Sequence, residues 1–254
     1  MHRILILGGT LEARRLAERL RGRADTAITL SLAGRTATPA PQPVPVRIGG
    51  FGGAEGLAAY LRAERIAALI DATHPYAATI SQNGARAAAM AGVRLLALRR
   101  PPWQRVPRDR WTDVADVPAA VRGLGPAPRR VFLALGRQEL GPFASAPQHR
   151  YLVRSVDPVD PPLAVPHASY LVARGPFAEA AERELLLAQG IDAIVSKNSG
   201  GEATYGKIAA ARALGVEVVM LRRPQLPAVP NVASVEEAAA WLDHALASVA
   251  VRGV

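Results

Sequence analysis

The chain has 254 residues, of which 50% are hydrophobic and 5% aromatic, and it contains no cysteine. The absence of cysteine excludes disulfides, thiolate metal sites and a cysteine nucleophile. Lysine and arginine number 31 against 21 acidic residues, a formal net charge of +10. The arginines are scattered and no dense basic run points to nucleic acid. We therefore expect an anionic small-molecule ligand, because arginine pairs with carboxylates and phosphates.

No apolar run reaches the roughly 18 residues that a membrane helix requires. Met1 leads almost directly into the first predicted strand, which leaves no room for a signal peptide. These features predict a cytoplasmic protein that does not interact with a membrane. We also expect a monomer without a metal ion.

The first predicted element is a buried strand, residues 4–7, followed by a glycine turn and a helix that carries Leu16 and Leu20. This order places backbone N–H groups at a helix N-terminus, where a phosphate can bind. The turn Gly8-Gly9-Thr10-Leu11-Glu12-Ala13 keeps the first glycine and the final alanine of the dinucleotide-binding fingerprint, but has Thr10 in place of the second glycine. A turn that only closes the βα corner is the alternative. The residues expected at the phosphates of a dinucleotide are Gly8, Gly9, Thr10 and Glu12.

A second predicted strand, residues 27–33, places Ser31, Arg35 and Thr36 near its carboxyl end. In NAD-binding folds an acidic residue near this position holds the ribose 2′-hydroxyl, whereas an arginine accepts the 2′-phosphate of NADP. The nearest acidic residue, Asp25, precedes the strand. The pattern therefore favours NADP, with these three side chains at the 2′-phosphate, over a role for Arg35 as an ordinary surface residue.

Two further predicted strands end in ligand-like sequences. Gly-Gly-Phe-Gly-Gly at 49–53 allows close approach of the backbone to a ligand or forms a mobile turn, and we assign Gly50 to the cofactor. The strand over 66–70 delivers Asp71-Ala72-Thr73-His74-Pro75-Tyr76 to its carboxyl end, where open α/β sheets bind ligands. A histidine and a phenol there can transfer or position protons. The expected catalytic residues are Asp71, His74 and Tyr76, with Thr73 beside the cofactor; capping of a turn is the alternative for Asp71.

A second α/β unit is predicted from residue 130 onward. A strand over 130–135 leads into Gly136-Arg137-Gln138-Glu139-Leu140, which repeats the strand–glycine–helix design of the first turn. A strand over 191–195 delivers a loop with a lysine, an amide, two hydroxyls and a glycine pair, typical of an anion-binding loop. Loop geometry alone is the alternative for the glycine pair. The residues expected to bind the substrate are Arg137, Lys197, Asn198, Ser199 and Gly200.

A weak internal repeat supports two similar halves. Residues 66–101 and 191–224 each run strand, polar loop, helix, Gly-Val, strand and Arg-Arg-Pro. The predicted fold is α/β, with two Rossmann-like parallel-sheet domains facing each other across a cleft. The predicted boundaries are an N-terminal NADP-binding domain over 1–100, a connecting segment over 101–129 and a substrate domain over 130–254.

With these motifs in order, the chain resembles the precorrin-6A reductase family of cobalamin (vitamin B12) biosynthesis over nearly its whole length. The motifs that carry the resemblance are Ile6-Leu7-Gly8-Gly9-Thr10 with Glu12-Ala13, Gly49-Gly50-Phe51-Gly52-Gly53, Asp71-Ala72-Thr73-His74-Pro75-Tyr76-Ala77, Gly136-Arg137-Gln138-Glu139, Arg174-Gly175-Pro176-Phe177 and Lys197-Asn198-Ser199-Gly200-Gly201. Leu11 departs from the hydroxyl residue common there, and Tyr76 replaces a frequent phenylalanine.

The resemblance implies an NADPH-dependent reduction of one macrocycle double bond of precorrin-6A, giving precorrin-6B. The substrate is a polycarboxylated tetrapyrrole, which suits an arginine-rich protein. The alternatives are a cobalt-precorrin-6A reductase, another NADP-dependent reductase, and a non-catalytic nucleotide-binding regulatory protein. A short-chain dehydrogenase is not expected, because Tyr-x-x-x-Lys is absent: Ile80 follows Tyr76 and Ala209 follows Tyr205 at that spacing.

Overall fold

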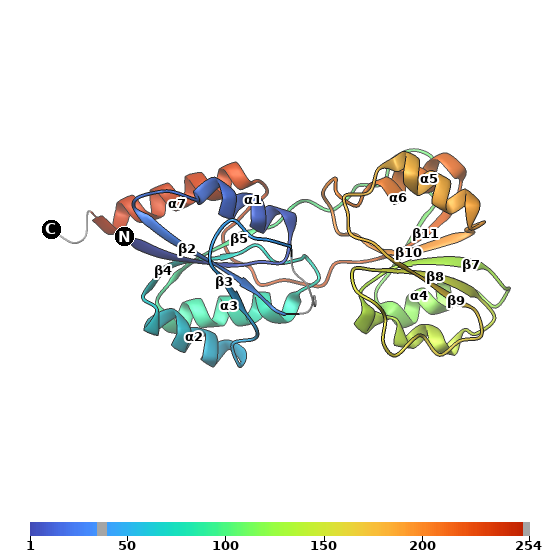
Figure 1. Ribbon diagram of the computed structural model, residues 1–254, viewed down its shortest axis with the longest axis horizontal. Helices are drawn as coiled ribbons and strands as arrows, with labels where there is room; N and C mark the ends of the chain where they lie inside the picture. Colours follow the sequence, from blue (N-terminus) through green and yellow to red (C-terminus); the bar gives the residue numbers. More distant parts are fainter. Residues whose placement is uncertain (35–39, 251–254) are drawn as a thin grey trace. The chain divides into compact units, whose positions relative to one another are not determined.

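The computed structural model describes residues 1–34 and 40–250 (Figure 1). The chain divides into two compact units. Unit 1 consists of Met1–Pro101 together with Pro224–Val254, and unit 2 consists of Pro102–Arg223. The chain therefore passes from one unit to the other twice.

In the described part of unit 1, six parallel strands form one sheet in the order β12-β5-β4-β1-β2-β3. The strands are β1 (His2–Leu7), β2 (Thr26–Leu32), β3 (Val46–Ile48), β4 (Ile66–Asp71), β5 (Arg94–Leu98) and β12 (Asn231–Val232). This is the strand order of a doubly wound dinucleotide-binding sheet, in which the direction of winding reverses between β1 and β4. The Rossmann-like prediction for this unit is confirmed.

Helices cover both faces of this sheet (Figure 1). They are α1 (Leu11–Leu20) and α7 (Val235–Ala250) on one face, and α2 (Gly53–Ala63) and α3 (Ala78–Ala91) on the other. The four consecutive apolar residues at the end of β1 point alternately to the two faces. Ile4 and Ile6 pack with α1 and α7, whereas Leu5 and Leu7 pack with α2 and α3.

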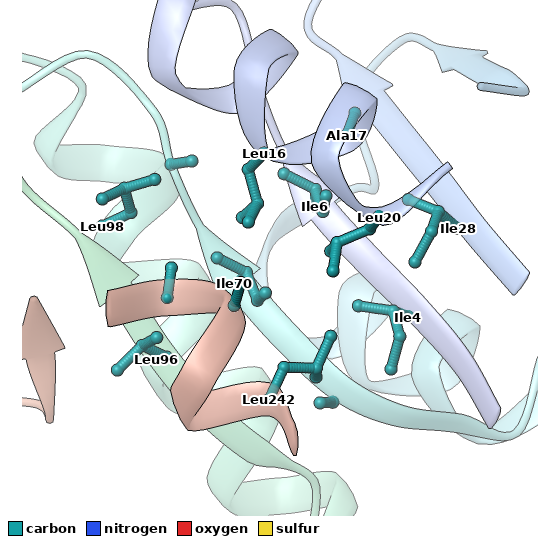
Figure 2. Packing of buried hydrophobic residues seen from close by; sticks show 14 of the residues in the cluster. Ile4, Ile6, Leu16, Ala17, Leu20, Ile28, Ile70, Leu96, Leu98 and Leu242 are labelled. Carbon is teal, nitrogen blue, oxygen red and sulfur yellow. The ribbon is translucent and has the colours of Figure 1, made fainter. Parts of the chain in front are cut away.

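Figure 2 shows the first of these cores, where α1 and the C-terminal helix meet the sheet. Leu16 and Leu20 of α1 and Leu242 of α7 lie against Ile4 and Ile6 of β1. Burying a leucine side chain in this way contributes about 1.5–3 kcal/mol. The described part of α7 is therefore an integral part of the core of unit 1.

Unit 2 repeats this design. Among its residues, six parallel strands follow the order β6-β11-β10-β7-β8-β9. The strands are β6 (Trp111–Val114), β7 (Arg130–Ala134), β8 (Arg150–Ser155), β9 (Ala168–Val172), β10 (Ala193–Lys197) and β11 (Glu217–Leu221). The helices are α4 (Val117–Gly123), α5 (Glu179–Ala188) and α6 (Gly206–Leu214), with 3₁₀ turns η1 (Arg137–Glu139) and η2 (Gly141–Ser145). Strand β7 has the central place that β1 has in unit 1, with β8 and β9 on one side of it and β10 and β11 on the other.

Each unit takes its sixth strand from outside its own run of five. Unit 2 uses β6, which precedes β7, and unit 1 uses β12, which follows unit 2 in the chain. The predicted boundaries of 1–100, 101–129 and 130–254 differ from this division, because 102–129 contributes β6 and α4 to unit 2 and the tail is buried in unit 1. That the two domains face each other across a cleft stays a prediction.

The prediction of a helix after Gly136 is wrong. The structure has the two short 3₁₀ turns η1 and η2 there. Pro142 lies in the second turn, and a proline that lacks its N–H disfavours a continuous α-helix through this segment. The sequence patterns also did not identify the short strands β6, β9 and β12.

Within the described residues, every helix is too short or too polar to cross a lipid bilayer.

Leu242→Ala should lower the free energy of unfolding by about 2–5 kcal/mol, since it removes a fully buried side chain from the core of unit 1. Leu187→Ala on α5, where the leucine is 60% exposed, is the matched control and should change it by less than about 0.5 kcal/mol. Urea unfolding measures both. Equal, small effects would show that α7 is not part of that core.

Candidate functional site

The turn after β1 is shaped by its glycines. A Cβ on Gly8 would lie 2.6 Å from Leu30 Cδ1, so a larger residue here would have to displace the buried Leu30 side chain. Gly9 has φ +106°, which L-residues rarely adopt, and a Cβ there would meet nothing within 4 Å. The turn therefore needs both glycines for different reasons, and the space beside Gly9 is open.

Four backbone N–H groups at this turn lack a hydrogen-bond acceptor in the described part of the chain. Thr10 is the N-cap of α1, and its hydroxyl accepts the N–H of Ala13 at 3.1 Å. The N–H groups of residues 9–12 have no acceptor among the residues that the structure describes. Unsatisfied donors and the positive end of a helix dipole are features that favour the binding of a phosphate.

Thr10 also joins the turn to the loop after β4. Its hydroxyl donates to the carbonyl of Ala72 at 2.7 Å, and the Ala72 N–H donates to Leu7 O at 3.0 Å. The two loops that flank the point where the winding reverses are thus fixed to each other. Open α/β sheets bind their ligands at this point.

Asp71 holds the loop after β4 through hydrogen bonds to its side chain. Its side chain is buried, and Oδ1 accepts both the N–H (3.2 Å) and the hydroxyl (2.6 Å) of Thr73. The Thr73 hydroxyl lies 3.4 Å from Ser81 Oγ on α3. This arrangement matches the turn-capping alternative for Asp71, and it fixes the backbone that carries His74.

His74 and Tyr76 are half-buried and lie beside each other. Their ring centroids are 5.6 Å apart, and Nδ1 of His74 accepts the N–H of Tyr76 at 3.3 Å. When the imidazole is neutral, this bond assigns its proton to Nε2. The structure places these two predicted catalytic residues together, at the same edge of the sheet as the Gly8–Thr10 turn.

Glu12 is held by an arginine that the sequence analysis did not assign to the site. Its carboxylate pairs with Arg100 at 2.5 Å, and both side chains are about four-fifths buried. Arg100 follows β5 and belongs to the first Arg-Arg-Pro tripeptide. The pair neutralises the only acidic side chain in the first turn of α1, which would otherwise oppose a phosphate.

The ends of β2 and β3 lie beside the turn. Ser31 is buried in β2, and its carbonyl accepts the N–H of Gly8 at 2.9 Å. Arg47 of β3 donates to the carbonyls of Gly49 (2.6 Å) and Gly50 (2.7 Å) and stacks on Phe51, 3.7 Å from its centroid. The glycine-rich segment is therefore held by an arginine. The other predicted 2′-phosphate ligands, Arg35 and Thr36, lie outside the described residues.

In unit 2, the predicted substrate residues follow the adjacent strands β7 and β10. Lys197 at the end of β10 forms an ion pair with Glu139, whose carboxylate also accepts the Gly136 N–H at 2.8 Å. Arg137 donates to the carbonyl of Pro158 at 3.3 Å and lies 3.8 Å from the Asp157 carboxylate. The basic residues thus lie together at one edge of this sheet, with two carboxylates among them.

Both polar atoms of the Asn198 amide form hydrogen bonds with Trp103. Its Oδ1 accepts the N–H of Trp103 at 2.7 Å, and its Nδ2 donates to the Trp103 carbonyl at 3.0 Å. The Trp103 indole donates to Gly201 O at 2.8 Å. Arg223 binds the carbonyls of Asn198 (2.9 Å) and Ser199 (3.1 Å). Trp103 and Arg223 are therefore structural partners of this loop; only the repeated tripeptide pointed to Arg223.

A buried polar cluster lies behind the same loop. Lys207 is 4% exposed, and its Nζ donates to Thr204 O at 2.7 Å and lies 4.8 Å from the Trp103 ring. Burial lowers its pKa from 10.5 to about 7; the Arg154 guanidinium acts in the same direction and Glu182 opposes it. Arg154 and Glu182 form a buried bidentate pair at 2.5 and 2.9 Å.

A separate cavity of about 370 Å³ lies at the opposite edge of the unit 2 sheet, by the starts of β7, β8 and β9. Arg130, Arg150 and His167 line it. None of the predicted site residues lines this cavity.

Comparison with known proteins identifies relatives over almost the entire chain. The model of the family described as precorrin-6x reductase CbiJ/CobK matches residues 3–243. A precorrin-6A reductase from a Sinorhizobium species is 61% identical over 96% of this chain and 94% of its own length. One from Rhodobacter capsulatus is 49% identical over 96% and 97%.

A solved structure of CobK precorrin-6A reductase superposes with a TM-score of 0.91 at 48% identity, covering 96% of this chain and 97% of its own. More distant relatives carry a different name: a protein from Priestia megaterium, 26% identical over 88% of this chain and 91% of its own length, is a cobalt-precorrin-6A reductase.

Thr10→Val should lower the free energy of unfolding by about 1–2 kcal/mol, because it removes the cap of α1 and the bond to Ala72. Thr10→Ser keeps the hydroxyl and should lie within about 0.5 kcal/mol of the wild type. Urea unfolding of both variants measures the difference. Equal losses of stability in the two variants would contradict the role assigned to the hydroxyl.

The buried amine of Lys207 should make stability depend on pH. Its pKa in the folded state, about 7, lies below its ordinary value of 10.5. Between these values the unfolded chain binds more protons, so the free energy of unfolding should rise with pH, by up to about 1.4 kcal/mol per pH unit. Urea unfolding at pH 7, 8 and 9 should show this extra slope in the wild type but not in Lys207→Met. Identical slopes would contradict the shifted pKa.

Proposed function

Because the chain belongs to the precorrin-6x reductase family CbiJ/CobK, we propose that it reduces precorrin-6A to precorrin-6B with NADPH. One hydride from NADPH and one proton add across a double bond of the macrocycle, and NADP⁺ is released. The chain is accordingly an oxidoreductase that acts on a CH–CH group, in cobalamin biosynthesis. The observation that carries the proposal is the array of N–H groups without acceptors at the start of α1, in a sheet of dinucleotide-binding order.

The Gly8–Thr10 turn fits the pyrophosphate of a dinucleotide. Gly9 leaves open space in front of the turn, and the N–H groups of residues 9–12 point to no protein acceptor among the described residues. These groups would hold the pyrophosphate, with the Glu12 carboxylate neutralised by Arg100. Gly50, at the end of the neighbouring β3, is proposed to approach the cofactor through its backbone.

We assign the 2′-phosphate of the cofactor to the end of β2. Ser31 lies there, and Arg35 and Thr36 follow it in the sequence. Asp25, the nearest acidic residue, precedes β2 and pairs with Arg23 at 3.0 Å. The end of β2 therefore has the composition that favours NADP over NAD.

The loop after β4 is proposed to position the reacting groups. Bound NADPH supplies the hydride. Asp71 fixes Thr73 through two hydrogen bonds, and this loop presents His74 and Tyr76. We assign proton delivery to Nε2 of His74 in the imidazolium form, which returns to the neutral imidazole after the transfer. Full turnover by His74→Ala would show instead that the macrocycle redistributes its own protons.

Unit 2 is proposed to bind the carboxylates of the tetrapyrrole. The residues assigned to the substrate are Arg137, Lys197, Asn198, Ser199 and Gly200. Charged donors bind carboxylates more strongly than neutral ones. Because the Asn198 amide is occupied by Trp103, its contribution lies in the shape of the loop.

We propose that the substrate is the metal-free precorrin-6A and not its cobalt form. The relatives that are 46–61% identical to this chain are named precorrin-6A reductase, whereas the cobalt-precorrin-6A reductases are 26–29% identical. A direct test mixes purified protein, NADPH and precorrin-6A and follows the visible spectrum of the macrocycle together with the loss of NADPH. Oxidation of NADPH without a spectral change would contradict the proposal, as would turnover of the cobalt form alone.

Arg35→Ala should raise the KM for NADPH about ten-fold or more and leave the KM for NADH almost unchanged, because only NADPH carries the 2′-phosphate. Arg15→Ala is the control: this arginine is exposed on α1 and forms no ion pair with a described residue. Steady-state kinetics with both cofactors measures the ratio. Equal losses for NADPH and NADH would refute the assignment of the 2′-phosphate.

A further inference from the structure

The loop from Asn198 to Thr204 has its carbonyl groups bound by the protein. Arg223 holds the carbonyls of Asn198 and Ser199, and the Trp103 indole holds that of Gly201. The backbone N–H of Phe177 donates to Ala203 O at 3.0 Å, and Lys207 donates to Thr204 O at 2.7 Å. These donors come from four separate segments of unit 2.

The N–H groups of the same loop have no such partners. Those of Gly200, Gly201 and Glu202 meet no acceptor within the described part of the chain. In a trans peptide the carbonyl and the following N–H point in opposite directions. Holding Ser199 O on Arg223 therefore turns the Gly200 N–H away from Arg223, and holding Gly201 O on Trp103 turns the Glu202 N–H away from Trp103.

Two further features make this loop suitable for an anion. Gly200 and Gly201 have φ of +68° and +71°, a conformation that favours glycine. Lys197 and Lys207 lie at its two ends. A loop with several side-chain donors on its carbonyls would be rigid, so little entropy would be lost when an anion binds.

We propose that the N–H groups of Gly200 and Glu202 bind a carboxylate of the substrate, and that Trp103 and Arg223 are positioning residues that hold this loop in its binding shape. The inference rests on the proposed function, because it takes the polycarboxylated tetrapyrrole as the ligand. It transfers the specificity for acetate and propionate groups from the Asn198 amide to the backbone. Trp103 and Arg223 act without touching the substrate.

The test uses two pairs of matched variants in the full-length protein. Trp103→Phe removes the indole donor to Gly201 O, whereas Trp111→Phe removes a buried indole N–H that has no partner among the described residues. Arg223→Gln removes the donors to Asn198 O and Ser199 O, whereas Arg222→Gln changes an exposed neighbour in the same tripeptide.

We expect Trp103→Phe and Arg223→Gln to raise the KM for precorrin-6A about ten-fold, the cost of one charge-assisted hydrogen bond. The KM for NADPH should stay within two-fold, and both controls should resemble the wild type. An unchanged substrate KM in both folded variants would overturn the inference. Equal increases for substrate and cofactor would also overturn it, since they would indicate general damage.

A second readout does not depend on turnover. In the ¹⁵N-labelled chain, uroporphyrin, a stable tetrapyrrole polycarboxylate, should shift the amide resonances of Gly200 and Glu202 saturably in the wild type and in Trp111→Phe. The shifts should need about ten-fold more uroporphyrin in Trp103→Phe. If the wild type shows these shifts but fails to reduce precorrin-6A, the proposed function fails and the anion site stands. If it reduces precorrin-6A while these two amides do not respond, the anion site fails alone.

Discussion

Both candidate binding sites depend on one constraint, which is that all described strands within each sheet run parallel. In each unit the carboxyl ends of the strands lie at one edge, so residues from distant parts of the sequence become neighbours there. The Thr10 hydroxyl uses this in unit 1, where it joins the turn after β1 to the loop after β4, 62 residues away. Without that parallel order, the turn after β1 and the loop that carries His74 would lie at opposite edges of the sheet.

In our proposal the two units would bind anions through different local structures. Unit 1 uses the start of a ten-residue helix, whose first N–H groups are unsatisfied. Unit 2 has only 3₁₀ turns after the corresponding strand, β7. There, side chains such as Trp103 and Arg223 bind the carbonyls of the loop after β10, and the N–H groups of residues 200–202 have no acceptor among the described residues. In both proposed sites the backbone N–H is the group that would bind the anion.

Local patterns predicted what local residues determine. Ile4 to Leu7 followed by two glycines was sufficient for β1, its turn and α1, because strand burial and the need for glycine are properties of that stretch. The fold of each unit and the strand ends that carry the candidate residues were predicted for the same reason.

The missing parts depend on distant partners. The two-residue strand β12 pairs with β5 from more than 130 positions away, and no periodicity exists in so short a segment. Asn198 could be identified as a polar residue at a strand end, but not as the partner of Trp103, 95 residues earlier. Glu12 and Arg100 are likewise 88 residues apart in the sequence, and only the folded chain brings their side chains to 2.5 Å from each other.

The most direct test of the account is a crystal structure of the protein with NADP⁺. We predict that the pyrophosphate lies against the N–H groups of residues 9–12, with the adenosine 2′-phosphate at the end of β2. Electron density that places the dinucleotide elsewhere, or a turn that stays empty at saturating NADP⁺, would contradict the account.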